Sequence, residues 1–220
     1  MESNKEHYIK ALRFNWLTKY YDAIVSFTTR EKTFKKRLIK YTDLKHNDEV
    51  LDIGSGTGTL AILIKESSPE ANVTGLDGDP EIIKIAENKS KKNKLKISFK
   101  QGLSFDMPFK DKQFDQCFSS LFFHHLTTSN KQKTFNQAYR VLKKGGQLHI
   151  ADWGKPSNKL MRILFFIVQL LDGFKTTKGN VDGILPELMK QAGFVEINIQ
   201  DEISTMLGTM TIYSAVKPLN

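Results

Sequence analysis

A glycine-rich segment between an expected strand and an expected helix carries residue types that could bind a charged ligand. The stretch Val50–Gly58 reads VLDIGSGTG, so Asp52 stands two residues before the first of three closely spaced glycines. Glycines here let a ligand approach the backbone, and the N-terminus of the following helix offers free N–H groups. The third glycine, Gly58, comes one residue earlier than the dinucleotide-binding pattern requires. A carboxylate at position 52 would repel a pyrophosphate, so the segment favours a ligand that carries a cationic amine.

A second acid stands where a ribose would be recognised. Asp77 ends the next expected strand, 19 residues after Gly58. In a doubly wound sheet, an acid at the end of the second strand can accept hydrogen bonds from both ribose hydroxyls. The ligand implied by these residues has a ribose, a positive group near Asp52 and no pyrophosphate. S-adenosylmethionine fits that description.

These side chains need a scaffold of alternating strands and helices, and the apolar pattern predicts one. Apolar runs bounded by turn residues predict strands over 49–53, 72–76, 97–100, 114–120, 147–152, 194–200 and 208–216. Three- and four-residue apolar spacing predicts helices after the glycine loop, over 81–92, from 127 to 142 with a stop at Gly145-Gly146, and near 157–172 and 181–192.

This alternation predicts an α/β fold with a doubly wound, Rossmann-like sheet of seven strands. The sheet is expected to be mostly parallel, with an antiparallel edge strand because the last two strands have a short connection. Residues 1–45 have helical spacing and are expected to form an N-terminal helical lid. Residues 46–220 are expected to form a single compact domain.

The amino-acid composition limits the kinds of ligand and partner that the chain is expected to bind. The 220 residues include 33 Lys and Arg against 24 Asp and Glu, which gives a net charge of +9. Only five of the basic residues are arginines, and phosphate and base recognition favours Arg over Lys. We therefore expect a solvated lysine-rich surface. The single cysteine, Cys117, excludes an internal disulfide and a Cys-based zinc cluster. No signal peptide or apolar run of about 20 residues is found, so a cytoplasmic location is expected.

The motifs resemble those of the class I S-adenosylmethionine-dependent methyltransferases over nearly the whole chain. The chain is most similar to the small-molecule "type 11" group, which includes the ubiquinone and menaquinone C-methyltransferases. The resemblance rests on the glycine loop, Asp77, the run Gly102–Phe109 (GLSFDMPF), Phe114-Asp115 and His124-His125-Leu126. One residue departs from the pattern, because Leu103 replaces the acid that usually contacts the adenine amino group. Apolar packing by Leu103 and a contact from Ser104 would have to replace it.

The resemblance implies a cofactor cleft at the carboxyl ends of the strands. The residues implied to line it are Tyr21, Asp52, Gly54, Ser55, Gly56, Gly58, Asp77, Gly78, Leu103, Ser104, Ser119 and Ser120. Asp52 would hold the cofactor's ammonium directly or through a water, and Asp77 its ribose. Ser119 and Ser120 would lie beside the methyl group. Tyr21 would close over the cofactor or pack within the lid.

Methyl transfer from a sulfonium depends mainly on alignment and on exclusion of water. A base is needed only when the acceptor arrives protonated. His124, His125 and Asp152 are the candidate catalytic residues, because they follow the fourth and fifth strands and imidazole can act as a base near neutral pH. The alternative is that the two histidines pack against the following helix or cap it. Nothing in the spacing requires a metal, and none is expected.

The expected function is transfer of a methyl group from S-adenosylmethionine to a small apolar or aromatic acceptor, with S-adenosylhomocysteine as the product. An RNA or DNA methyltransferase and a non-catalytic binding module remain alternatives. Nucleic acid is disfavoured because Ser119–Phe122 (SSLF) stands where base-modifying relatives carry an Asn/Asp-Pro-Pro-aromatic run. The apolar segment 160–171 is expected to wall the acceptor pocket, to pack on the N-terminal helix, or to make weak contact with a membrane surface.

Overall fold

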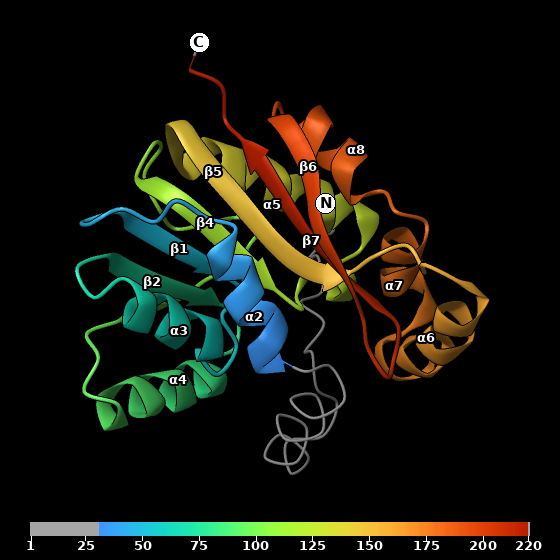
Figure 1. Ribbon diagram of the computed structural model, residues 1–220. Coiled ribbons are helices and arrows are strands. Elements are labelled where there is room, and N and C mark those ends of the chain that lie inside the picture. The colour runs from blue at the N-terminus through green and yellow to red at the C-terminus, as the bar shows by residue number, and fades with distance from the viewer. Residues whose placement is uncertain (1–30, 220) are drawn as a thin grey trace, which may run out of the picture.

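The structure, a computed structural model, describes residues 31–219 (Figure 1). Its strands are β1 (Glu49–Ile53), β2 (Asn72–Asp77), β3 (Ser98–Gln101), β4 (Phe114–Ser120), β5 (Leu142–Trp153), β6 (Val195–Ser204) and β7 (Thr209–Val216). Its helices are α2 (Glu31–Lys40), α3 (Thr59–Ser67), α4 (Pro80–Lys92), α5 (Thr128–Val141), α6 (Lys159–Asp172), α7 (Phe174–Val181) and α8 (Leu185–Gln191). A short 3₁₀ turn, η2 (Phe123–His125), precedes α5.

All seven strands form one sheet in the order β3-β2-β1-β4-β5-β7-β6. The pairs from β3 to β5 are parallel, whereas β7 runs antiparallel to both β5 and β6. The predicted fold class is confirmed, and the β6–β7 hairpin is the antiparallel addition at the edge. The strand order reverses between β1 and β4, which opens a crevice at their carboxyl ends where such sheets bind ligands.

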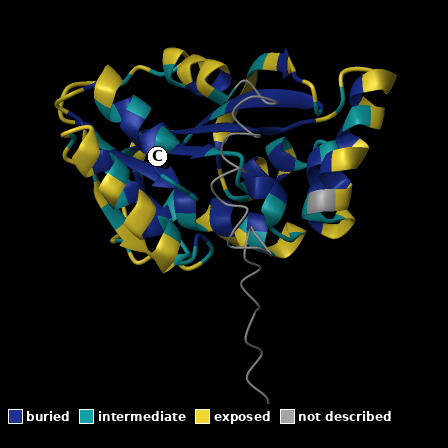
Figure 2. Ribbon diagram, turned by 90° about the horizontal axis from the view of Figure 1, so that it is seen from below, coloured by how far each residue is buried: buried dark blue, intermediate teal, exposed yellow. Residues whose placement is uncertain are grey.

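Helices cover both faces of the sheet, so the strands are buried between them (Figure 2). On one face, α5 and α8 pack against the sheet around Phe135 and Leu188. On the other face, α2, α3 and α6 contribute Phe34, Leu60 and Phe165 to a second core cluster. Two apolar layers of this kind fix the sheet rigidly and leave its carboxyl edge for binding.

The boundary between α5 and β5 differs from the prediction. The helix was expected to run to 142 and α5 does end at Val141, but β5 begins at once with Leu142 rather than at Gln147 after the two glycines. Both glycines lie within β5, where the register with β4 is irregular. Gly145 has a φ of +75°, and a Cβ on Gly146 would lie 2.9 Å from the carbonyl oxygen of Asp115. The glycine pair therefore serves an irregular strand rather than a helix end.

Three helices stand where the sequence predicts two. Gly173, with a φ of +94°, ends α6, and α7 follows directly. The buried residues of α7 are Thr176, Thr177, Gly179 and Asn180. Because this helix buries small and polar residues, apolar spacing gives no signal for it.

The part of the expected lid that the structure describes is α2. Phe34 and Leu38 are fully buried there, in the same cluster as Val50 and Phe118 of the sheet. Tyr21 lies outside the described residues, as do the other aromatic residues expected in the lid. Within 31–219, no helix is long and apolar enough to cross a bilayer.

Candidate active site

The loop after β1 has a backbone that only glycine adopts easily. Gly54, Gly56 and Gly58 have φ angles of +68°, +52° and +76°. A Cβ on Gly54 would lie 2.2 Å from the ring of Phe122, and one on Gly58 would lie 2.9 Å from Phe99. A Cβ on Gly56 would meet nothing within 4 Å. The outer two glycines are thus required by packing within the protein, whereas Gly56 faces open space that a ligand can fill.

The Asp77 carboxylate is fixed against this loop at the end of β2. Its Oδ2 accepts a hydrogen bond from the amide of Gly56 at 2.9 Å, and its Oδ1 accepts one from the amide of Asp79 at 3.0 Å. Burial raises the pKa of Asp77, and these backbone hydrogen bonds oppose the rise. A positioned carboxylate beside the glycine loop can receive further hydrogen bonds from a ligand's hydroxyl groups.

A cleft of about 720 Å³, measured with the solvent at its mouth, opens at this edge of the sheet. The cleft is lined from the ends of β1 and β2, the loops after β3 and β4, and the first turn of α5. Its lining residues are Gly54, Leu76, Asp77, Gly78, Gly102, Leu103, Ser104, Phe105, Phe122, His125, Leu126, Thr127 and Asn130. Five of the predicted cofactor residues and one of the two histidines therefore share one cleft.

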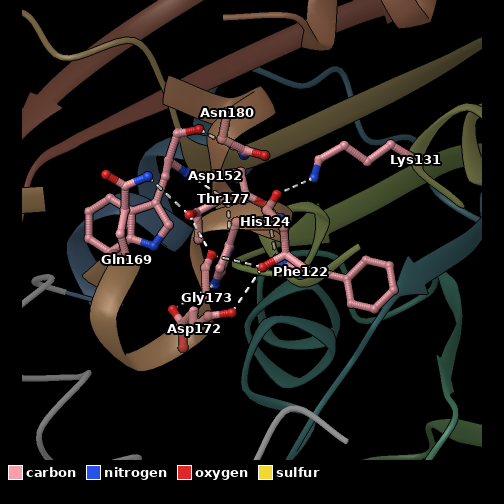
Figure 3. A network of polar contacts seen from close by, with 11 residues as sticks. Phe122, His124, Lys131, Asp152, Gln169, Asp172, Gly173, Thr177 and Asn180 are labelled. Atoms are coloured by element: carbon pink, nitrogen blue, oxygen red, sulfur yellow. Dashed lines mark hydrogen bonds and ion pairs between the residues drawn. The ribbon is translucent and has the colours of Figure 1, made fainter. Parts of the chain in front are cut away.

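A buried polar network lies behind the cleft (Figure 3). The Nδ1 atom of His124 is 2.7 Å from Oδ1 of Asp152. The Asp152 carboxylate also accepts hydrogen bonds from the amides of Phe122 and Trp153, at 3.1 and 2.7 Å. On the other side of the ring, Nε2 of His124 lies 3.6 Å from Oδ2 of Asp172 in α6. Burial lowers the pKa of His124, but the two carboxylates outweigh it and the pKa is raised.

His125 has the opposite electrostatic character. Its ring lies 4.0 Å from that of His124, centre to centre, and it lines the cleft. Burial lowers the pKa of His125 well below 6.5, and the nearby His124 and Lys131 lower it further. At neutral pH this imidazole is uncharged and can accept a proton.

Three side chains of this network could also hold a metal ion. His124, His125 and Asp172 each offer a ligand atom, and these atoms lie within 4.8 Å of one another. The chemistry of a His₂–carboxylate set suits a divalent transition metal. We assign no metal to it, because transfer of a methyl group from a sulfonium needs none and the His124–Asp172 ion pair accounts for the approach of these two side chains.

Known proteins with similar sequences are methyltransferases. A family model for the methyltransferase domain matches residues 50–146. A demethylmenaquinone methyltransferase of Symbiobacterium thermophilum is 26% identical over 97% of this chain and 94% of its own length. A ubiquinone/menaquinone biosynthesis C-methyltransferase of Bdellovibrio bacteriovorus is 33% identical over 56% of this chain and 51% of its own, so the chain spans about half of that relative. Residues 50–146 thus form a methyltransferase domain.

Solved structures share the fold of this methyltransferase. An S-adenosylmethionine-dependent methyltransferase of Methanosarcina mazei has a TM-score of 0.67 and 22% identity, covering 83% of this chain and 98% of its own. A phosphoethanolamine N-methyltransferase of Haemonchus contortus, with S-adenosylhomocysteine bound, has a TM-score of 0.68 and 18% identity. The matched region covers 84% of this chain and 52% of the Haemonchus contortus protein. These likenesses confirm the sheet and its flanking helices.

Asp52 of the methyltransferase fits a cationic group of the cofactor. Its side chain is buried in β1, and neither carboxylate oxygen makes a well-formed hydrogen bond within residues 31–219, although the Ala61 amide is near enough to lower its pKa. Burial raises the pKa of Asp52 to about 7, although Lys35 lowers it. A buried carboxylate without partners is costly, and an ammonium group brought to it would remove that cost. The residues present therefore suit S-adenosylmethionine.

This arrangement predicts a pH dependence of cofactor binding. Because the pKa of Asp52 is raised to about 7, the free protein holds a proton there at lower pH, and an ammonium group must displace it. We expect the affinity for S-adenosylmethionine to rise with pH up to about 7, by roughly tenfold per unit in the steepest part. Calorimetric titrations between pH 5.5 and 7 measure this slope. An Asp52→Asn variant should bind more weakly at pH 7 without the slope, and a wild-type affinity constant over this range would contradict the assignment.

A substitution of Asp77 tests the ribose contact. Asp77→Ala should weaken S-adenosylmethionine binding by about 2–3 kcal/mol, because hydrogen bonds to a carboxylate are lost. Asp79→Ala is the matched control, since Asp79 caps α4 by accepting from the amide of Glu81 and does not line the cleft. Calorimetry on both variants separates ligand contact from loop stability. Equal affinities of the two variants would rule out the ribose contact.

Other predicted residues have different surroundings. Ser119 is fully buried, and its hydroxyl donates to the carbonyl oxygen of Ile53 at 2.8 Å, so it points into the sheet. The Ser104 hydroxyl is 2.9 Å from that of Thr134, although Ser104 also lines the cleft. The buried Ser55 hydroxyl has no partner among the described residues. Ser120 is half-buried and is not among the residues that line the cleft.

Two polar residues of the network carry no signal in the sequence. Asp172 faces His124 from a helix that begins 35 residues later. Lys131 is fully buried in α5, where its Nζ donates to the carbonyl oxygens of Leu126 and Thr176 at 2.5 and 2.8 Å. Burial lowers the pKa of Lys131 to about 8. Neither residue belongs to a motif, so only the fold brings them to the histidines.

Proposed function

We propose that this methyltransferase methylates a small aromatic acceptor of the quinol class. The observation that carries the proposal is the position of His125 on the wall of the cleft that Asp77 and Gly54, the first glycine of the loop, also line. A proton acceptor and the predicted cofactor groups thus face one space. The apolar part of that wall, which includes Leu103, Phe105 and Phe122, suits an aromatic ring. The demethylmenaquinone methyltransferase that aligns with 97% of this chain supports the same class of acceptor.

The chain's residues bind and orient the two reactants. We assign the cofactor's ammonium to Asp52, its ribose to Asp77, and its methionine backbone to the space beside Gly56. Leu103 and Ser104 are assigned to the adenine, and Tyr21, which lies outside the described residues, to the lid expected over residues 1–45. When bound, S-adenosylmethionine supplies a methyl group on a positively charged sulfur. A nucleophile attacks the methyl carbon, and the sulfur leaves as a neutral thioether. The protein's contribution is to align the attack and to exclude water.

In this proposal His125 takes the acceptor's proton. Its pKa lies well below 6.5, so the ring is neutral and ready to accept a hydroxyl proton, which makes the acceptor a stronger nucleophile. His124 and Asp152 act as positioning residues. The buried Asp152 carboxylate fixes both the His124 ring and the backbone turn before His125.

An assay with labelled cofactor tests the function. The protein is incubated with methyl-deuterated S-adenosylmethionine and, separately, a demethylated menaquinol with a short side chain, or a mixture of RNA and DNA fragments. We expect one labelled methyl group on the quinol, with one equivalent of S-adenosylhomocysteine formed. Label in the nucleic acid and none in the quinol would overturn the proposed acceptor class.

An acceptor of this class with a long apolar tail resides in a bilayer. Weak contact of this protein with a membrane surface is therefore part of the proposal. The helices beside the cleft are the elements that could provide it.

A further inference from the structure

The outer face of α6 exposes large apolar side chains in a continuous row. These residues, here called the α6 stripe, are exposed by 46–68% and are Leu160, Ile163, Phe166, Ile167, Leu170 and, at the start of α7, Phe174. Their spacing of three and four residues places them along one side of the helix. Of the other large exposed apolar residues of the described chain, Met206 lies in the β6–β7 turn, which packs against α6 at Phe165, and the rest are just after α2, on α4 and β6, and in the C-terminal segment.

The orientation of α6 about its own axis is fixed by its buried side, so the α6 stripe faces solvent. The opposite side of α6 is anchored, because Phe165 and Val168 are buried in the core and the Phe165 ring packs against Trp153 at 5.3 Å. Asn158 caps the helix by accepting from the amide of Met161 at 2.9 Å. The orientation of α6 about its axis is therefore fixed. The apolar residues on its inner side pack in the core, whereas those of the α6 stripe have no such packing role.

Cations surround the stripe. Lys155, Lys159, Arg162 and Lys175 are all exposed on or beside α6. The only acid between positions 155 and 178 is Asp172, which is half-buried and faces His124. A row of apolar side chains bordered by Lys and Arg is the pattern of a helix that lies in the boundary between lipid headgroups and acyl chains. Lysine is depleted in protein–protein interfaces, and three of these four cations are lysines, so the composition favours a lipid surface over a second copy of the chain.

We propose that the α6 stripe and its cations dock the methyltransferase on an anionic lipid bilayer. The apolar side chains enter the headgroup boundary, while the four cations contact lipid phosphates. The same helix carries Asp172 into the network behind the cleft, so docking places the active site one helix away from the membrane. The surface itself carries this inference, and the proposed quinol acceptor adds only a reason for it.

Sedimentation with vesicles tests the docking directly. We use phosphatidylcholine vesicles with and without about 30% phosphatidylglycerol, since anionic headgroups attract basic segments. The wild-type protein should bind the anionic vesicles, and more weakly as salt rises. Ile163→Ser/Leu170→Ser should reduce the partition coefficient about tenfold. The matched control is Ile85→Ser/Ile199→Ser, which removes comparably exposed apolar residues from α4 and β6 and should bind as the wild type does.

Three results would overturn the inference. One is equal binding of the wild type and Ile163→Ser/Leu170→Ser to anionic vesicles. The second is equal binding of the wild type to both kinds of vesicle. The third is a stable dimer, seen by analytical ultracentrifugation without lipid, that this variant converts to a monomer. Turnover of a water-soluble short-chain quinol should be the same in wild type and variant. A protein that fails this turnover but binds vesicles would refute the acceptor class and leave the docking surface intact.

Discussion

Gly56→Val is expected to abolish S-adenosylmethionine binding while the protein remains folded. The backbone at Gly56 has a φ of +52°, and a Cβ there would project into open space rather than into the protein. A β-branched side chain would fill the room that we assign to the methionine part of the cofactor. We expect a loss of about 4 kcal/mol, or roughly 10³-fold in affinity, measured by calorimetry.

Backbone strain at Gly56 needs its own control, because valine disfavours a positive φ. Gly183 has a φ of +73° and stands in the turn between α7 and α8, away from the cleft. A Cβ on Gly183 would meet no atom closer than 3.7 Å. Gly183→Val should lose a similar amount of stability and keep its affinity for the cofactor. If Gly56→Val is folded by circular dichroism and still binds tightly, the loop is a tight turn and not a cofactor site.

His125→Asn is expected to lower kcat about 10³-fold while cofactor affinity stays close to that of the wild type. The variant keeps a polar side chain on the cleft wall but cannot accept the acceptor's proton as imidazole does. His46→Asn is the matched control, since His46 is exposed in the segment before β1. Steady-state kinetics with the quinol, together with calorimetry, give the two quantities.

The pH profile separates a base from a packing residue. Since the pKa of His125 lies well below 6.5, its imidazole is neutral throughout the range from pH 6.5 to 8. The wild-type kcat should therefore be nearly flat in this range and fall only in more acidic solution. An unchanged kcat in His125→Asn would show that the histidine serves packing alone.

Much of the fold follows from local sequence patterns. The apolar run 114–120 coincides with β4, and the runs ending at Ile53 and near Asp77 coincide with β1 and β2. The two errors have physical causes. A Gly-Gly pair can end a helix or accommodate an irregular strand, and the Asp115 carbonyl that approaches Gly146 comes from a residue far away in the sequence. The helix α7 buries threonine, glycine and asparagine, so its buried side has no periodic apolar pattern in the sequence.

Site residues that belong to a sequence motif could be predicted, whereas residues that only tertiary structure brings to the site could not. Asp77 and Gly54 were expected in the cleft from the glycine loop and the strand that follows it, Leu103 was expected there from the family resemblance, and all three line it. Ser119 was expected there too, but its hydroxyl is held by β1, because the strand's alternation turns it inward. The apolar segment 160–171 was expected to wall the acceptor pocket. In the structure Phe165 is core and Phe166 is on the surface, since an apolar residue's type does not say which side of a helix it occupies.

A crystal structure of the protein with S-adenosylhomocysteine tests the central claim most directly. We predict that the ligand lies in the cleft, with both ribose hydroxyls within hydrogen-bond distance of the Asp77 carboxylate. Its amino group should lie beside Asp52, and its amino-acid backbone should pass over Gly56. A ligand bound elsewhere, or one whose ribose and amine avoid both carboxylates, would contradict it.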